Sequence, residues 1–241
     1  MAELSEIFNV ELLNRFFKHQ TDAGSPMFFA MRTFSCLPLD FPKLLKLKQE
    51  VGDVLRGSAY GKNYGSWISE FGQLNQIWEL WAYDSLADYE YLNIKLLNNK
   101  EWVNEYCNLA TDWINDRNIR LMKSQYDFKT SITQENIFEY RYYILKNGME
   151  KKWIGLLKHV LPVRETYSEL VGLWSTIAPQ PNEVSHLWRY PDLNARQKIR
   201  AELAYDENWV NFQQKGRPLL CELNSVILRP TSLPSVGQTK R

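Results

Sequence analysis

The residues of this sequence best suited to proton transfer are a glutamate and a histidine in two similar segments. The segments are LNQIWELWAY, residues 74–83, and PNEVSHLWRY, residues 181–190, and Glu79 of the first aligns with His186 of the second. A histidine titrates near neutral pH, and a neighbouring carboxylate would complete an acid/base pair. We therefore take Glu79 and His186 as the candidate catalytic residues. The alternatives are a structural histidine and a glutamate paired with an arginine, either Arg32 or Arg141.

Further polar and aromatic residues share a strand face with this pair, because side chains alternate along a strand. The predicted binding residues on that face are Asn75, Trp81 and Tyr83 in the first segment and Asn182, Trp188 and Tyr190 in the second. This mixture favours a ligand cavity over a dry sheet-to-helix layer. We expect Leu80 and Leu187, on the opposite face, to fill the layer under the helices.

Two arginines inside expected strands, Arg32 and Arg141, complete the set of predicted substrate-binding residues. An arginine there could hold a carboxylate with two hydrogen bonds. An internal ion pair between Arg141 and Glu139 is the favoured alternative.

Several chemistries have no motif in the sequence. It contains no phosphate-binding glycine loop, no GxSxG motif and no HExxH or other metal-ligand spacing. The three cysteines are widely separated, and the three histidines would allow haem only through a single axial ligand such as His186. We therefore expect no metal and no cofactor.

The elements that must position these residues follow one order twice, β-α-β-β-α-β. In the first repeat we predict strands at 27–36, 64–70, 73–83 and 119–128, with helices over 38–56 and, interrupted near residues 98–99, between the last two strands. In the second repeat we predict strands at 136–145, 170–178, 182–190 and 219–228, with helices over 149–167 and 192–215.

A constant separation of 107 positions supports this duplication. It relates Trp67 to Trp174, Trp81 to Trp188 and Trp102 to Trp209, without a gap, in a chain that has only 9 tryptophans. A fixed period is how internal repeats appear in sequence. The predicted organisation is an N-terminal helical extension and linker (1–26), two domains (27–130 and 135–231) and a tail (232–241).

The predicted fold class is α+β, with two tandem ferredoxin-like domains. In this plan the helices cover one face of each sheet, so the two uncovered faces can pack together. We expect them to close into an α+β barrel around an interior cavity shared by Glu79 and His186.

The motifs also resemble a known family. Gly65-x-Trp67, the segment from Leu74 to Tyr83, and His186-Leu187-Trp188-x-Tyr190 are similar to NIPSNAP sequences over about residues 27–231. The resemblance implies a dimeric α+β-barrel fold with tandem domains and says little about activity. Glu79 stands where the family pattern more often has histidine, which would make any duplicated cavity asymmetric.

Composition gives no nucleic-acid or membrane partner. Lys and Arg number 29 against 28 Asp and Glu, and no apolar run is long enough to span a bilayer. The sequence also lacks the apolar core of a secretory signal, so we expect a cytoplasmic protein. An amphipathic helix within residues 3–19 needs a surface to cover, which favours a homo-oligomer.

Two classes of function fit these observations. In the first, the chain is a cofactor-independent enzyme of small-molecule, secondary metabolism that binds an aromatic or conjugated substrate and uses acid/base or monooxygenase-like chemistry. In the second, it is a non-catalytic binding or scaffold protein.

Overall fold

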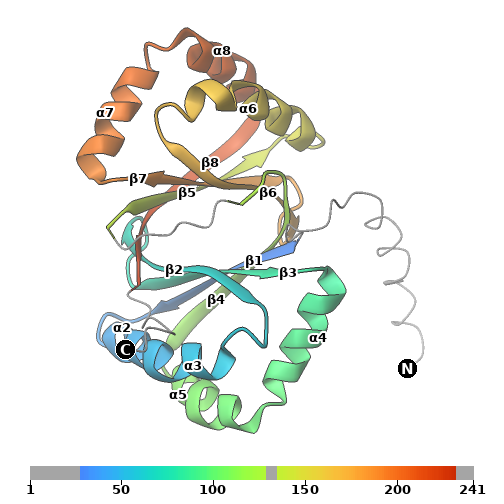
Figure 1. The fold of residues 1–241 in the computed structure, drawn as a ribbon, viewed down its shortest axis with the longest axis vertical. Helices are drawn as coiled ribbons and strands as arrows, with labels where there is room; N and C mark the ends of the chain where they lie inside the picture. The colour runs from blue at the N-terminus through green and yellow to red at the C-terminus, as the bar shows by residue number, and fades with distance from the viewer. Residues whose placement is uncertain (1–27, 129–134, 232–241) are drawn as a thin grey trace, which may run out of the picture.

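The structure is a computed structural model that describes residues 28–128 and 135–231 (Figure 1). The first repeat contains strands β1 (Phe28–Cys36), β2 (Lys62–Phe71), β3 (Gln76–Tyr83) and β4 (Ile114–Ser124). Its helices are α2 (Phe41–Leu47), α3 (Asp53–Arg56), α4 (Leu86–Leu97) and α5 (Asn108–Thr111), with π-helical turns at Lys48–Gly52 and Trp102–Cys107.

The second repeat follows the same order of elements. Its strands are β5 (Ile137–Leu145), β6 (Glu169–Ala178), β7 (Glu183–Tyr190) and β8 (Leu220–Pro230). Its helices are α6 (Glu150–Arg164), α7 (Leu193–Leu203) and α8 (Glu207–Gly216), followed by a 3₁₀ turn at Arg217–Leu219. The predicted N-terminal helix and the tail at 232–241 lie outside the described residues.

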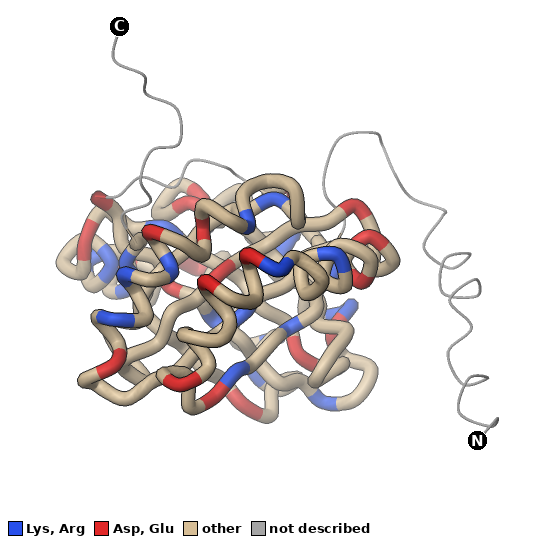
Figure 2. The backbone as a smooth tube through the Cα atoms, turned by 90° about the horizontal axis from the view of Figure 1, so that it is seen from below, with Lys and Arg blue, Asp and Glu red and all other residues tan. Residues whose placement is uncertain are grey.

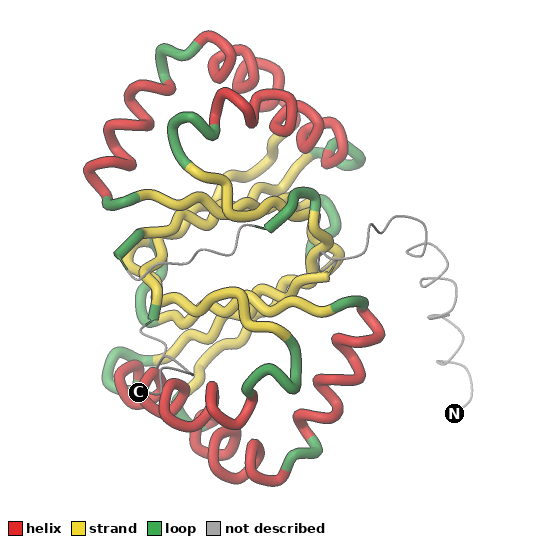
Figure 3. Tube along the Cα trace, in the orientation of Figure 1, coloured by secondary structure: helices red, strands yellow, loops and turns green. Residues whose placement is uncertain are grey.

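The eight strands form one closed antiparallel barrel in the order β1-β3-β2-β8-β5-β7-β6-β4. The two repeats join at two seams, where β2 pairs with β8 and β4 pairs with β6. The two sheets face each other between two outer layers of helices, as Figure 3 shows. The predicted fold class is therefore confirmed.

The barrel interior is built from large apolar side chains of both repeats. Trp67 and Trp174 are fully buried there with Phe29, Phe138 and Leu228. Each tryptophan follows a glycine by two residues, and the strand register shifts beside both Gly65 and Gly172. A Cβ on Gly172 would lie 2.4 Å from the Trp174 indole. Gly172 thus makes room for the Trp174 side chain inside the barrel.

The orientation of the central strands is the reverse of the prediction. Leu80 and Leu187 belong to the barrel interior, whereas Trp81 and Trp188 lie in the clusters on the helix side. Facing sheets need apolar contact surfaces, while the indole N–H groups find partners under the helices. The alternation of side chains along β3 and β7 was predicted correctly, but the face that points into the barrel was assigned wrongly.

Surface charge is mixed over the described residues. Figure 2 shows positively and negatively charged residues interspersed along the described chain, in keeping with a formal net charge of +1. Within the described ranges no helix has both the length and the apolar character to cross a membrane.

Candidate functional site

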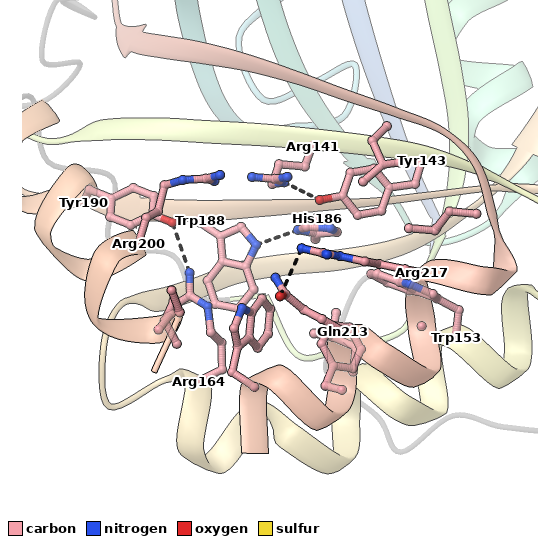
Figure 4. Close-up of a pocket in the computed structure, with 18 residues that line it drawn as sticks. Arg141, Tyr143, Trp153, Arg164, His186, Trp188, Tyr190, Arg200, Gln213 and Arg217 are labelled. Carbon is pink, nitrogen blue, oxygen red and sulfur yellow. Dashed lines mark hydrogen bonds between the residues drawn. The ribbon is translucent and has the colours of Figure 1, made fainter. Parts of the chain in front are cut away.

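The main candidate site is a cavity of about 450 Å³ in the second repeat, between the outer face of its sheet and its helices (Figure 4). Its walls combine arginines with aromatic rings. The cationic lining residues are Arg141, Arg164, Arg200 and Arg217, and the aromatic ones are Tyr143, Trp153, Trp188, Tyr190, Trp209 and Phe212, with His186 among them. The lining contains no acidic residue among those described.

His186 lies in β7 and is 4% exposed. Its Nδ1 accepts a hydrogen bond from the Trp188 indole at 2.5 Å, and its ring stacks on Trp153 with the ring centres 5.7 Å apart. An indole can only donate, so the proton of the neutral imidazole resides on Nε2. Nε2 is buried and has no hydrogen-bond partner among the described residues. Burial, together with the positive charge of Arg141, holds the pKa of His186 well below 6.5.

Arg164, at the end of α6, supplies a buried positive charge to this cavity. Its guanidinium lies 4.0 Å above the Trp188 ring and donates to the Tyr190 hydroxyl at 3.1 Å and to Ser168 Oγ at 2.6 Å. No carboxylate of the described residues lies within ion-pair distance of it. Burial lowers the pKa of Arg164, as expected for a cation without a counter-ion.

Arg141 has a counter-ion in Glu139. The Glu139 carboxylate is fully buried and accepts from Arg141 at 2.8 Å, from Arg196 at 2.7 Å and from Ser225 at 2.8 Å. Burial by itself would raise the pKa of Glu139, but these arginines lower it to about 2. The ion pair predicted as the favoured alternative for Arg141 is confirmed. Arg141 Nε also donates to the hydroxyl of Tyr143.

The corresponding place in the first repeat is nearly filled. A cavity of about 110 Å³ is lined there by Glu79, Lys48 and Arg32, among others. Lys48 lies 3.1 Å from Glu79 and 2.6 Å from Asp53, and the Trp81 indole donates to Glu79 at 3.0 Å. Burial raises the pKa of Glu79, but Lys48 and two arginines outweigh it and lower the pKa to about 2. Glu79 is therefore a buried, ionised carboxylate.

The prediction that Glu79 and His186 share one cavity is wrong. Glu79 lines the small cavity of the first repeat and His186 lines the large cavity of the second. Each side chain lies among residues of its own repeat's helices. The barrel lies between the two helix layers (Figure 3). Equivalent positions of two facing repeats point in opposite directions, so the two side chains cannot meet. They do not form the predicted acid/base pair.

The remaining predicted residues divide between the two repeats. Trp188, Tyr190 and Arg141 line the large cavity with His186. Trp81 and Tyr83 are buried in the apolar cluster that includes residues of α4 and also contact Arg56, which lies 3.5 Å from the Trp81 ring and donates to the Tyr83 hydroxyl at 2.9 Å.

The two predicted asparagines are turn residues outside both cavities. Asn75 has a positive φ of 56° just before β3, and its carbonyl accepts from the Cys36 amide. Asn182 is half-buried beside Asn147, to which it donates a hydrogen bond. Asparagine tolerates the left-handed conformation, so Asn75 serves the turn there.

Sequence reasoning missed the arginines that the helices contribute. Arg56 and Arg164 end the first helical region of each repeat. Each makes the same contacts with the tryptophan and the tyrosine of the third strand of its own repeat. The repeat could have revealed this pair, since the two positions differ by 108, close to the period of 107. Arg200 and Arg217 have no such signal, because the fold alone brings them to the cavity.

The fold and site define a tandem α+β barrel with a cavity between sheet and helices in one half. The NIPSNAP family profile matches residues 29–125 and 138–234, so the chain belongs to the NIPSNAP family. It is similar to Protein NipSnap homolog 2 of Mus musculus, with 28% identity over 87% of this chain and 79% of the mouse protein.

Solved structures share the fold. A monooxygenase-like protein of Fusobacterium nucleatum superposes with a TM-score of 0.65 at 9% identity, over 86% of this chain and 93% of that one. An anthrone oxidase-like protein gives a TM-score of 0.63 at 12% identity, over 88% and 94% of the two chains.

Proposed function

We propose that the second repeat binds a small organic anion with a flat, conjugated body, and that the first repeat does not. The observation that carries this proposal is the buried Arg164, which has no carboxylate partner among the described residues and lines a cavity walled by aromatic rings. A buried cation without a counter-ion is costly, and an anionic ligand would supply one. Aromatic walls favour a flat, conjugated body by stacking.

The contrast between the repeats supports the location. In the first repeat the Glu79 carboxylate lies 3.9 Å from Arg56, which is the counterpart of Arg164. Glu79 thus provides from within the chain the negative charge that the second repeat lacks. His186 in the matching position is neutral, so the charge must come from a ligand.

Acid/base turnover by a Glu79–His186 pair is not part of this proposal, because the two residues line different cavities. His186 acts in it as a hydrogen-bond donor. Any reaction of the ligand would take place in the second repeat, without help from Glu79.

The donor set argues against haem at His186. An axial histidine binds iron through one ring nitrogen and donates its other N–H to an acceptor. Here Nδ1 accepts from the Trp188 indole, which leaves the proton on Nε2, the nitrogen that would have to bind iron. We therefore propose a ligand site that needs no cofactor.

Titration calorimetry with 7-methoxycoumarin-3-carboxylate, a flat aromatic anion, tests the proposal. Arg217→Gln removes an exposed cation of the large cavity, and Arg117→Gln removes an exposed cation of the small one. We expect one site per chain, and an affinity that falls about three- to tenfold in Arg217→Gln, as expected for one lost charged contact. Binding should be unchanged in Arg117→Gln. No binding, or a loss confined to Arg117→Gln, would refute the proposal.

A further inference from the structure

The wall of the large cavity carries a hydrogen-bond donor that has no acceptor. The Nε2–H of His186 is buried and unpartnered among the described residues, while Nδ1 is held by Trp188. The ring is fixed on its other faces, since it stacks on Trp153 and meets the Tyr143 ring edge-on with ring centres 5.0 Å apart. A rigid donor in this setting is suited to an acceptor atom of a ligand.

Tyr143 offers a second donor beside it. The Tyr143 hydroxyl accepts from Arg141 Nε, and its own proton has no acceptor within the part of the chain that the structure describes. The side chain is 6% exposed and lines the same cavity. Two neighbouring neutral donors, each held by a further contact, form the kind of arrangement that stabilises an oxyanion.

The charges around these donors favour a negative oxygen. Arg141 and Arg164 face the imidazole from β5 and α6, and the nearest carboxylate, Glu139, is already bound by Arg141 and Arg196. Burial first, and then the charges of the two arginines, lower the pKa of His186, so that the neutral ring remains a donor. Arg200 and Arg217, at the end of α7 and just after α8, add positive charge to the lining.

We propose that this cavity selects the ionised form of a hydroxyl-bearing conjugated ligand, with the phenolate or enolate oxygen seated on His186 Nε2–H and Tyr143 O–H. This inference rests on the proposed function, which requires only an anionic flat ligand. The O–H bond of the ligand is broken, its proton is released to solvent, and the electron pair stays on the oxygen. No oxidant or other reactant is involved in this step.

The test uses two probes with the same framework. 7-Hydroxycoumarin-3-carboxylate can ionise at its hydroxyl, and its phenol and phenolate forms absorb at different wavelengths, whereas 7-methoxycoumarin-3-carboxylate cannot ionise there. With the protein in excess, the absorbance of the hydroxy probe is recorded against pH. We expect the hydroxyl of the bound probe to ionise at least about one pH unit lower than that of the free probe, since a positive environment shifts an acid by this much or more.

Variants of the two donors locate the effect. Tyr143→Phe removes only the hydroxyl, and His186→Leu removes the imidazole donor, while His186→Gln keeps an N–H group. We expect Tyr143→Phe and His186→Leu each to lose most of the pH shift, measured at protein concentrations that saturate the probe. His186→Gln should retain part of the shift. Thermal melting checks the fold, and Tyr143→Phe decides the result if His186→Leu does not fold.

The outcomes separate the two proposals. If both probes bind and the hydroxyl ionises at its free-solution pH or higher, the inference is wrong and the proposed function stands. If the shift persists in full in Tyr143→Phe and His186→Leu, these donors do not cause it and the inference is wrong. If neither probe binds the wild-type protein, both proposals fail together.

Discussion

At the scale of single residues, the two cavities differ in charge at one aligned strand position. In the first repeat Glu79 ion-pairs with Lys48, and the remaining space is about 110 Å³. In the second repeat the aligned His186 is neutral, and the space is about 450 Å³. In both repeats a helix arginine stacks on a tryptophan ring and donates a hydrogen bond to a tyrosine hydroxyl. The two repeats thus share the arginine–tryptophan–tyrosine contacts and differ in the charge at the Glu79/His186 position.

Stability should respond to mild acid through His186. Its pKa is lowered on folding, so below about pH 6.5 the unfolded chain binds a proton that the native chain does not. The free energy of unfolding should therefore fall by about 1.4 kcal/mol for each pH unit below that point, and this contribution should be missing in His186→Gln. Urea unfolding at pH 7.5, 6.5 and 5.5 measures it. Equal slopes for the wild type and His186→Gln would contradict the assignment.

Glu79→Gln should destabilise the protein strongly. The substitution leaves the buried Lys48 with Asp53 alone and Arg56 without its nearest carboxylate. Breaking a buried ion pair from one side costs about 3–5 kcal/mol. Urea unfolding at pH 7 measures this loss, and Glu70→Gln, which breaks an exposed pair with Arg229, is the matched control with an expected cost below about 1 kcal/mol. A similar loss in the free energy of unfolding for the two variants would show that the Glu79 ion pair does not stabilise the fold.

At the scale of elements, the central strands are fixed in position because both of their faces are packed against other parts of the protein. All eight residues of β3 are buried, one face in the barrel and the other under the helices. On β6, Gly172 leaves space for the Trp174 side chain in the interior. The helices contribute arginines to the outer face of each sheet, whereas the barrel interior is lined by large apolar side chains.

Gly172→Ala should lower stability without touching the cavity. Its Cβ would overlap the Trp174 indole at 2.4 Å, and Phe128 at 3.2 Å leaves little room to move. Overpacking of this kind costs about 1–3 kcal/mol. Melting curves measure the loss, and Gly155→Ala, where the added Cβ meets nothing within 4 Å, serves as the control. An equal melting temperature for Gly172→Ala and the wild type would contradict the packing role of the Gly-x-Trp motif.

The elements could be predicted from the sequence because strands and helices leave local patterns, and the barrel could be predicted because the 107-residue period shows the duplication. It could not show which face of β3 points inward, because a strand buried on both sides carries no polar face to mark solvent. Trp81 and Trp188 resembled cavity residues, and only Trp188 lines one. The cavity also depends on Arg200 and Arg217, whose approach to His186 is set by the tertiary fold.

At the scale of the whole molecule, the two repeats pack into one closed barrel. The interior cluster takes residues from both repeats, and the seams β2–β8 and β4–β6 close the barrel. Neither sheet can bury its inner face without the other. The expected homo-oligomer would add an outer interface to this unit and stays a prediction, which light scattering can test against the mass of 28.5 kDa.

Trp67→Ala should therefore weaken both repeats together. Removing a fully buried tryptophan lowers the free energy of unfolding by about 3–5 kcal/mol. The variant should therefore unfold in a single transition at a lower urea concentration than the wild type. Tryptophan fluorescence and far-UV circular dichroism should give coincident unfolding curves for the wild type and the variant. Two separate transitions would show that the repeats fold independently.

The central claim is that the ligand cavity is the one beside His186 in the second repeat. The most direct measurement is a crystal structure of the complex with 7-hydroxycoumarin-3-carboxylate. We expect density for one probe per chain between the second sheet and helices α6 and α8, with its 7-hydroxyl oxygen on His186 Nε2 and its carboxylate among the arginines. Density beside Glu79 and Lys48, or inside the barrel between the two sheets, with the His186 cavity empty, would contradict it.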